Sequence, residues 1–384
     1  MPTNIKARES TENIPASRRV RDVSNTIHYL DPNENPFTLL MKRSQRRTVV
    51  NSKFEWIEKE LPTKVDQVNG AQTSGETAIE VDNGNLYFPH DLVLNVRTNE
   101  IFRVVSVAAN VLTVVRGVGS VAGAAMNDND DVMIVGSANE EGGALGTERS
   151  VQEAYPFNYT EIYRHPFGTT GTEAASENYG GTDRPRLRKE AGVYHMIDLE
   201  YSNIYGQRNI DTTDTNKPRR YSGGFLYWVT TNVQDALGTL TEPEMETFCQ
   251  TAFASTGGSN TRVFLASPLV VSVLDQIAAG RLQTVPKAQT YGVDVQQWVT
   301  VHGTLLVVKH RLLKHGPGGT GFGGHALAID PKKLAYASLR TRDTKLLVDR
   351  QSPGDDAWTD EYLTECGFEV RNQQVHAVLK GVTG

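Results

Sequence analysis

The chain has 384 residues, of which 38% are hydrophobic and 22% charged, so it supports two or three folded units and excludes disorder throughout. Its net charge of −6 is unevenly distributed along the chain. Residues 1–53 hold ten Lys or Arg and five Asp or Glu, a net charge of +5, so the other 331 residues carry −11. No stretch approaches the roughly 18 consecutive apolar residues of a membrane helix, and the N-terminus lacks the apolar core of a signal peptide.

The first part of the chain reads as an extended basic arm. Residues 1–26 are polar, show neither a helical nor a strand period, and contain a cluster of arginines at Arg18, Arg19 and Arg21. We expect such a segment to become ordered only against a partner. Its charge suits contact with nucleic acid or, the interpretation we favour, ion pairs with a neighbouring subunit. A short helix is predicted from Phe37 to Met41, after a turn cluster.

Two segments about a hundred positions apart share a strand pattern. Lys53–Leu61 and Asn158–His165 both alternate apolar and polar residues, close to a period of two. We interpret them as the two arms of one long hairpin, and we place the arms at 53–66 and 157–168.

The residues between these arms predict an inserted all-β module. Five β-branched runs recur every ten to fifteen residues between Asn, Asp and Gly, a spacing typical of a small barrel or sandwich. The runs are Thr77–Val81, Leu92–Val96, Ile101–Val107, Val111–Val115 and Val132–Val135. Tight turns are expected at Thr98–Glu100 and Ala109–Asn110. With its following linker, the module spans 67–156.

A long helix is predicted over Pro185–Tyr205, after a link rich in Gly, Thr and Ser. Pro185 suits the first turn and Gly206 suits the end of a helix. Steps of four and three place one apolar face on this helix, formed by Leu187, Ala191, Tyr194, Ile197, Tyr201 and Ile204.

From Phe225 onward helices and strands mix without regular alternation, which favours an α+β fold. Helices are predicted at Leu226–Leu237, Glu242–Ala254 and Leu269–Ala279, the last ended by Gly280. Strands are predicted at Thr261–Leu265, Gly303–Lys309 and His325–Ile329, and Gly367–Leu379 reads as one long strand or paired strands.

A glycine-rich loop offers the only nucleotide-binding pattern that we find. Gly316–Gly321 satisfies G-x-G-x-x-G, but Pro317 removes one amide, and a β-like run follows where a dinucleotide site needs a helix. We interpret it as a hairpin loop. The alternative, an enzyme or ligand-binding protein that uses 316–324, stays open at this point.

Metal and catalytic motifs find little support. His302, His310 and His315 lie close in sequence, but H-E-x-x-H is absent and the two cysteines, Cys249 and Cys366, lie far apart. The cysteines read as buried, reduced thiols of a cytoplasmic protein, and Asp128–Asp131 reads as a turn. G-x-S-x-G and S-x-x-K in the required context are also absent. We therefore predict no catalytic, metal-binding or cofactor-binding residues, no cofactor and no enzyme.

Seven phrases, taken in order, resemble a known family. They are Ser24–Phe37, Lys53–Ile57, Asn158–Tyr163, Tyr291–Val295, Val301–Leu305, Asp360–Glu365 and His376–Val382. Together they resemble major capsid proteins of tailed bacteriophages, in the group typified by the SU-ten-type major head protein. The resemblance covers nearly the whole chain.

The resemblance implies the Hong Kong 97-type capsid fold, which is α+β, here with an inserted small all-β domain. The expected parts are an N-terminal arm (1–52), extended-loop arms (53–66 and 157–168) that hold the inserted module and linker (67–156), a peripheral domain with a spine helix (169–224), an axial domain (225–345) and return strands of the peripheral domain (346–384). Some relatives carry a scaffolding segment of about a hundred residues before the loop. Only some fifty residues precede it here, so we expect a separate scaffolding protein.

The implied function is the major capsid protein of a tailed double-stranded DNA phage. Hexamers and pentamers of the chain would form an icosahedral shell around the DNA, without binding it sequence-specifically or contacting a membrane. Expected partners are the chain itself, a portal, a scaffolding protein and a decoration protein, with assembly in the host cytoplasm. The alternative is an encapsulin-like compartment shell. Candidate inter-subunit contacts are Arg18, Arg19, Arg21, Trp56, Ile57, Tyr159 and Ile162, and we expect the four apolar side chains to become buried only on assembly.

Overall fold

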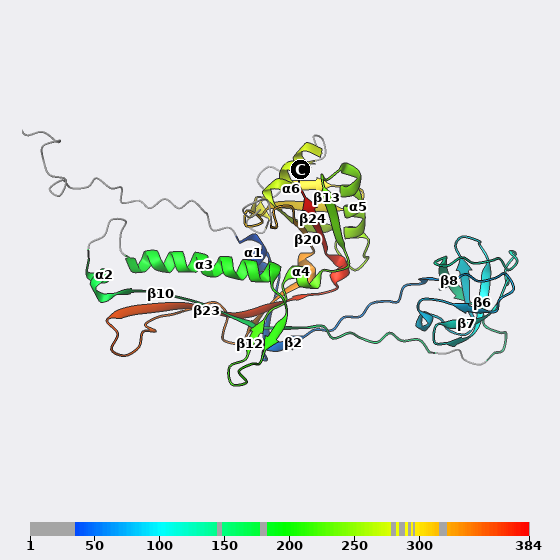
Figure 1. Cartoon of the computed structure of the whole chain (residues 1–384), viewed down its shortest axis with the longest axis horizontal. Helices are drawn as coiled ribbons and strands as arrows, with labels where there is room; N and C mark the ends of the chain where they lie inside the picture. Colours follow the sequence, from blue (N-terminus) through cyan, green and yellow to red (C-terminus); the bar gives the residue numbers. More distant parts are fainter. Residues whose placement is uncertain are drawn as a thin grey trace, which may run out of the picture. The chain divides into compact units, whose positions relative to one another are not determined.

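The computed structural model describes residues 35–143, 148–176, 183–277, 282–283, 289–290, 293–294, 296–314 and 321–383. The chain forms two compact units: one combines Met1–Trp56 with Pro156–Gly384, and the other is Ile57–Tyr155 (Figure 1). We call the first the body and the second the module. Most of the predicted basic arm, including Arg18, Arg19 and Arg21, lies outside the described residues, as does most of the glycine-rich loop.

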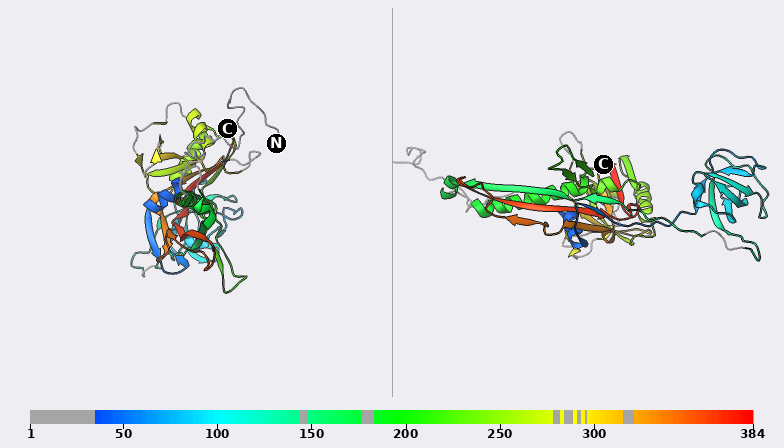
Figure 2. Two further views of the ribbon diagram at one scale, coloured as in Figure 1. Left: turned by 90° about the vertical axis from the view of Figure 1, so that its left-hand side faces the viewer. Right: turned by 90° about the horizontal axis from the view of Figure 1, so that it is seen from below.

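A five-stranded sheet in the body is built around its longest strand, β23 (Ala357–Val370). β10 (Glu161–Thr170) runs antiparallel to β23, from Glu161 opposite Cys366 to Thr170 opposite Ala357. Along the other edge of β23 lie β21 (Leu334–Leu339) and β22 (Lys345–Leu347), and β1 (Gln45–Val49) pairs parallel with β21. Figure 2 shows α3 (Asp183–Tyr205) lying along this sheet.

A seven-stranded sheet forms the other half of the body. Its order is β13 (Val233–Gly238), β24 (Ala377–Val382), β20 (Ala326–Ile329), β14 (Thr261–Ala266), β19 (Thr304–Lys309), β18 (Gln296–Val299) and β15 (Leu282–Gln283). β16 (Gln289–Thr290) pairs with β17 (Val293–Asp294), and β11 (Asn209–Asp211) pairs with β12 (Arg219–Tyr221). Short 3-10 turns lie at Pro331–Lys333 and Gln373–Val375.

The two faces of the seven-stranded sheet carry different hydrophobic cores, because successive side chains of a strand point to opposite faces. Phe264 and Val307 pack on one face with α5 (Glu242–Phe253) and α6 (Pro268–Ile277). Leu265 and Val308 pack on the other face with α1 (Pro36–Arg43), α3 and α4 (Phe225–Trp228). The long helix predicted from Pro185 to Tyr205 and the short helix from Phe37 are thus present, while the short helix α2 (Gly171–Ala175) was not predicted.

The expectation of a single apolar face on α3 is wrong in part. Tyr194 and Tyr201 are 59% and 41% exposed, while polar residues of the same helix are buried. Burial is possible because these residues have partners: His195 Nε2 lies 2.7 Å from Thr364 Oγ1, and Asn203 donates to Thr38 Oγ1. Buried polar groups that are hydrogen-bonded can replace apolar ones in a helix–sheet contact.

Two further expectations for the body need correction. The helix predicted over Leu226–Leu237 is only one turn long, and β13 follows it, because Val233–Gly238 completes the sheet beside β24. The boundary expected between 345 and 346 does not separate the two sheets. β21 precedes it and pairs with β23, while β24 follows it and joins the seven-stranded sheet.

A buried carboxylate fixes the beginning of α1 against α3. Glu200 is fully buried, and its side chain accepts hydrogen bonds from the backbone N–H groups of Phe37 (2.8 Å) and Thr38 (2.7 Å). The Nε2 atom of buried His310 lies 2.7 Å from the same carboxylate. A carboxylate at a helix N-terminus satisfies unpaired N–H groups and the helix dipole together. The segment after the N-terminal arm is thereby tied to the long helix.

The module is a closed β-barrel. Its strands are β3 (Val65–Gln67), β4 (Ala78–Glu80), β5 (Asp91–Asn95), β6 (Ile101–Ala108), β7 (Val111–Val115) and β8 (Asp131–Ser137), and a 3-10 turn lies at Gly84–Leu86. The strand order in the sheet is β3, β8, β5, β6, β7, β4. The two end strands, β3 and β4, meet through a bridge between Val68 and Val81, which closes the sheet. The five predicted strands are confirmed, and closure selects the barrel over the sandwich. Sequence reasoning missed β3, which is only three residues long.

The predicted hairpin is paired over a short distance. β2 (Lys53–Glu55) pairs antiparallel with β9 (Phe157–Tyr159), and Glu58 bridges to Ala154. From Glu161 onward the second predicted arm pairs with β23 instead, because β23 offers a partner over ten residues. The arm 157–168 is therefore a hairpin strand only at its start.

An ion pair stabilises one end of the module. Asp130, which is 8% exposed, accepts hydrogen bonds from Arg97, Asn95 Nδ2 and the backbone N–H of Asn127. The Arg97 guanidinium lowers the pKa of Asp130 to about 2. Folding of the module therefore favours the charged form of the Asp130 carboxylate.

We predict that Glu200→Ala lowers the free energy of unfolding by about 3 kcal/mol or more, because buried donors then lose their acceptor at roughly 1–3 kcal/mol each. Urea unfolding of the unassembled protein, followed by tryptophan fluorescence, measures this. Glu190→Ala on the same helix is the control, with an expected cost of about 0.5 kcal/mol. Equal effects of the two substitutions would contradict this account of Glu200.

A second prediction concerns acid. Because the pKa of Asp130 is lowered by folding, its contribution to stability is complete above about pH 4 and is lost as the pH falls towards 2. The protection of amides in β5 and β8 against hydrogen exchange, relative to the intrinsic rate at each pH, should fall over this range. Asp130→Asn should raise exchange at pH 7 and remove most of the acid response, while Asp82→Asn, an exposed carboxylate of the module, should preserve it. An unchanged acid response in Asp130→Asn would refute the assignment.

Candidate assembly surfaces

The base of the hairpin is anchored to the body by aromatic side chains. Trp56 is 5% exposed and packs against Trp228 (ring centroids 5.1 Å apart) and Phe54 (6.4 Å). Val49 and Ala337 complete this cluster. The expectation that Trp56 becomes buried only on assembly is therefore wrong, because Trp228 at the end of α4 already covers it within one chain.

An arginine locks the second strand of the hairpin. The Arg208 guanidinium lies over the rings of Phe157 (4.0 Å), Tyr227 (5.2 Å) and Trp228 (5.3 Å), and its Nη1 donates to the carbonyl of Phe157 at 2.8 Å. Cation–π contacts of this kind each contribute about 0.5–2 kcal/mol. Sequence reasoning missed Arg208, because no pattern near it in the sequence indicates which aromatic rings it contacts.

The backbone of the hairpin passes close to β23 at a glycine. A Cβ on Gly367 would lie 2.5 Å from the carbonyl oxygen of Tyr159 and 3.1 Å from the ring of Phe54. A side chain does not fit there without displacing backbone. Gly367 thus lets the hairpin cross the sheet face opposite α3.

The remaining predicted contact residues differ in exposure. Ile162, on β10, is 48% exposed, and Tyr159 is half-buried with its ring 5.7 Å from that of Phe157. Ile57, Leu61 and Tyr155 belong to the module and are 64%, 83% and 58% exposed. These exposures leave apolar area for a neighbouring copy, most of it on the segments at 57–61 and 155.

The sheet face opposite α3 carries a row of buried glutamates held by arginines. Glu361 accepts from Arg164, Glu365 from Arg342, and Glu369 from both Arg47 and Arg371. The glutamates are at most 4% exposed, whereas the arginine side chains are 30–56% exposed. Hydrogen bonds from Arg164 hold the pKa of Glu361 below its usual value. The four-residue spacing of these glutamates was the sequence signal that could have placed them on one face of a strand.

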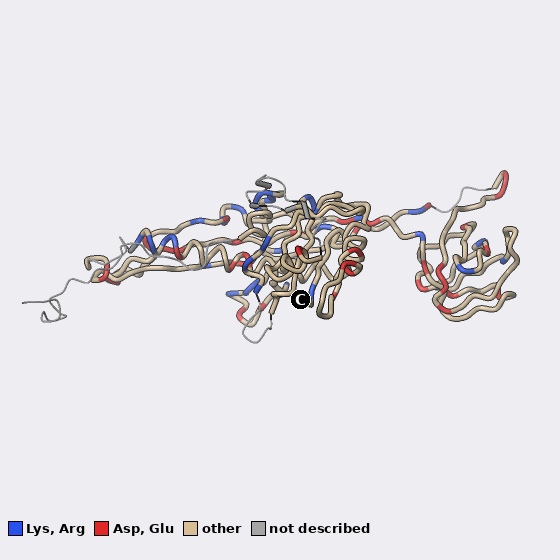
Figure 3. Tube along the Cα trace, turned by 90° about the horizontal axis from the view of Figure 1, so that it is seen from above, with Lys and Arg blue, Asp and Glu red and all other residues tan. Residues whose placement is uncertain are grey.

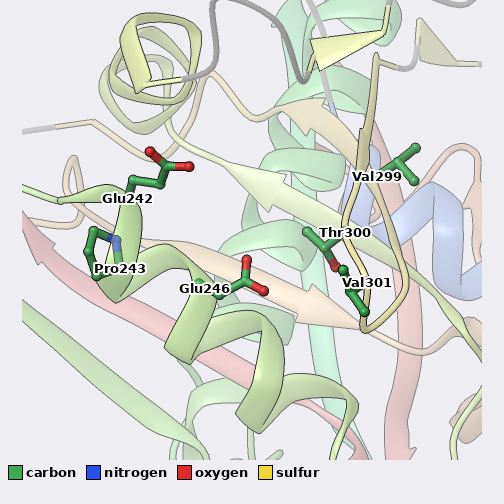
Figure 4. Close-up of a pocket in the computed structure, with 6 residues that line it drawn as sticks. All are labelled: Glu242, Pro243, Glu246, Val299, Thr300 and Val301. Carbon is green, nitrogen blue, oxygen red and sulfur yellow. The ribbon is translucent and has the colours of Figure 1, made fainter.

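A cleft opens between α5 and the turn from β18 to β19. Thr241 and Glu244 form a capping box that begins α5. The cleft is about 640 Å³ in volume and is lined by Glu242, Pro243, Glu246, Val299, Thr300 and Val301 (Figure 4). Val301 is 97% exposed, and His302 Nε2 lies 3.3 Å from Glu246.

An aromatic patch lies beside the C-terminal end of α3. Tyr205 lies between Tyr201 and Phe322, with ring centroids 6.0 Å and 4.1 Å away. The Tyr201 hydroxyl donates to the carbonyl of Leu312 at 3.5 Å, so the segment after β19 lies against the helix. Tyr201 and Phe322 are 41% and 39% exposed.

The motifs considered for metal and nucleotide chemistry do not converge. His302 contacts Glu246 and His310 contacts Glu200, at opposite ends of β19, while His315 lies outside the described residues. Among the described residues, no group of three or more His, Cys, Asp or Glu is placed to hold a metal ion. Within the same ranges no helix is both long and apolar enough to span a bilayer.

Comparison with known proteins places the chain in a family. A family model described as "SU10 major capsid protein" matches residues 3–383. The major capsid protein of Pseudomonas phage PaMx41 is 23% identical over 341 residues, which is 82% of this chain and 81% of that protein.

Solved phage capsids share the fold. The capsid asymmetric unit of cyanophage A-1(L) matches with a TM-score of 0.55 and 11% identity over 98% of this chain and 100% of that one. The capsid of cyanophage P-SCSP1u matches with a TM-score of 0.51 and 10% identity over 96% of this chain and 94% of that one. The chain therefore belongs to the SU10 major capsid protein family and is a phage major capsid protein with the Hong Kong 97-type fold.

Proposed function

We propose that copies of this chain form hexamers and pentamers of an icosahedral shell that encloses the double-stranded DNA of a tailed phage. One observation carries the proposal. The segments that leave the hairpin expose Ile57, Leu61 and Tyr155, although the hairpin itself is anchored by Trp56 and Arg208. A firm base with exposed apolar extensions suits burial against a sister copy, in contacts of roughly 2,000 Å² or more.

The parts of the chain then have distinct roles. Of the arm expected over 1–52, the part before α1 reaches a neighbour through Arg18, Arg19 and Arg21, because α1 and β1 are packed into the body. The loop with arms at 53–66 and 157–168 presents Ile57, Tyr159 and Ile162 to another neighbour. Residues 169–224 and 346–384 form the peripheral domain, and 225–345 form the axial domain, with two exceptions. β21 pairs with β23 of the peripheral domain, and β24 joins the seven-stranded sheet of the axial domain. The module, within 67–156, adds contacts or docks a decoration protein.

The partners follow from this role. A portal, a scaffolding protein and a decoration protein join the shell, which assembles in the host cytoplasm and then belongs to the virion. The DNA is enclosed without sequence-specific contacts, and the −6 net charge of the chain suits a wall that does not hold DNA tightly.

We predict closed particles when the chain is expressed with its scaffolding protein, visible by negative-stain microscopy. The same chain expressed alone should give capsomers or irregular shells, because its exposed apolar segments still require partners. An inert monomer under both conditions would argue against the proposed function.

A further prediction concerns the hairpin anchor. Arg208→Ala removes contacts with three rings and a backbone hydrogen bond, so the unassembled chain should lose about 1–2 kcal/mol of stability. The yield of particles should fall at least tenfold, because the loop is no longer directed towards a neighbour. Arg219→Ala, an exposed residue of β12, is the control and should leave the yield unchanged. A normal yield from Arg208→Ala would show that the anchor is dispensable.

A further inference from the structure

A leucine in the body is both strained and exposed. Leu237 lies in β13 with a φ of 49°, and its side chain is 89% exposed. A left-handed backbone costs free energy for a branched side chain but not for glycine. Of the large hydrophobic residues that the structure describes, only Val301 is more exposed. Strain and exposure are both unfavourable in a lone copy, and a residue held in this way suggests a contact with another molecule.

The turn that carries Leu237 is firmly held. Asp235 Oδ1 accepts a hydrogen bond from the backbone N–H of Leu237 at 3.0 Å, and the flanking Ala236 and Leu240 are buried in the core beside α5. Gly381 leaves room for Asp235, because a Cβ on Gly381 would collide with Oδ1. These contacts require the turn but not the leucine, since glycine at 237 would form the same turn without strain. We call residues 235–238 the leucine turn.

The cleft beside α5 offers an apolar wall that is open to solvent. Val299 and Val301 line this cleft of about 640 Å³ and are 45% and 97% exposed. Figure 4 shows them across the cleft from Glu242 and Glu246, and Figure 3 shows acidic residues on α5, which forms the opposite wall. Residues 297–301 carry no charge. The wall formed by the turn from β18 to β19 therefore suits an apolar side chain.

The leucine turn and the cleft wall lie far apart in the seven-stranded sheet. β13 begins the strand order and β18 stands sixth, so five spacings of about 4.8 Å, or roughly 24 Å, separate them. Leu237 and Val301 are both almost fully exposed, so they do not cover each other within one copy. β15 pairs with β18 only at Gln297 and Trp298, and it leaves the cleft wall unpaired. A second copy can cover both surfaces at once.

We propose that Leu237 of one copy inserts into the cleft of the next copy, against Val299 and Val301, in a head-to-tail contact within the rings of the shell. Such a heterologous contact uses two different surfaces of each copy and forms a ring when its rotation closes. Burial of the leucine and the two valines removes apolar area from water, which offsets the strain of the leucine turn. This inference rests on the proposed function and names a contact within a ring.

Replacement of Leu237 by glycine separates the contact from the fold. Leu237→Gly removes the apolar side chain together with the strain, so the urea midpoint of the unassembled chain should not fall. The yield of particles should nevertheless fall at least tenfold. Thr341→Gly is the matched control, because Thr341 is also exposed and has a φ of 68°, and it should leave the yield unchanged. A normal yield from Leu237→Gly would overturn the contact.

Cysteine cross-linking tests which surfaces meet. Leu237→Cys and Val301→Cys are made separately in the full chain, whose own Cys249 and Cys366 are buried. Each is assembled with an excess of unmodified chain, which maintains particle formation, and is then treated with oxidised glutathione. Particles that contain both variants should yield disulfide-linked dimers, and particles that contain either one alone should yield none. Linkage of Leu237→Cys to itself, or no linkage in the mixed particles, would overturn the head-to-tail contact.

The outcomes separate this inference from the function on which it rests. Normal assembly of Leu237→Gly, or linkage between like surfaces, would overturn the leucine contact while leaving the shell function intact. Failure of the unmodified chain to assemble with its scaffolding protein would overturn the proposed function, and the contact with it.

Discussion

The antiparallel pairing of β10 with β23 joins residues about two hundred positions apart, and most of the body depends on it. One face of this ribbon receives α3 through Thr364 and Phe368. The other face carries the buried glutamates and, at Gly367, lies in close contact with the hairpin. Because side chains alternate along a strand, a single register sets both faces at once.

This pairing also explains why the hairpin is short and firm. β10 turns away to β23 immediately after β9, so β2 and β9 share only three residue pairs. Trp56 and Arg208 compensate by fixing the base through Trp228 and Phe157. The chain thus combines a rigid origin with apolar segments that find no cover in the described part of their own unit, a combination suited to building a shell from identical copies.

Local patterns in the sequence predicted local structure well. The barrel strands, the long helix and the strand character of both hairpin arms followed from periodicity and turn residues. Long-range partners did not, because no local pattern encodes them: Trp56 is buried by Trp228, and α3 turns Tyr201 outward because Glu200 has Phe37 and Thr38 as partners. The helix expected over Leu226–Leu237 failed for the same reason, since β24 recruits Val233–Gly238 as a strand.

The central claim is that the segments beyond the hairpin find their stable environment only against sister copies. Hydrogen exchange of the peptides covering 57–64 and 148–155, in the unassembled chain and in particles, tests it most directly. The account predicts rapid exchange in the unassembled chain and strong protection in particles. Equal protection in both would mean that these segments are already satisfied within one copy, and would contradict the claim.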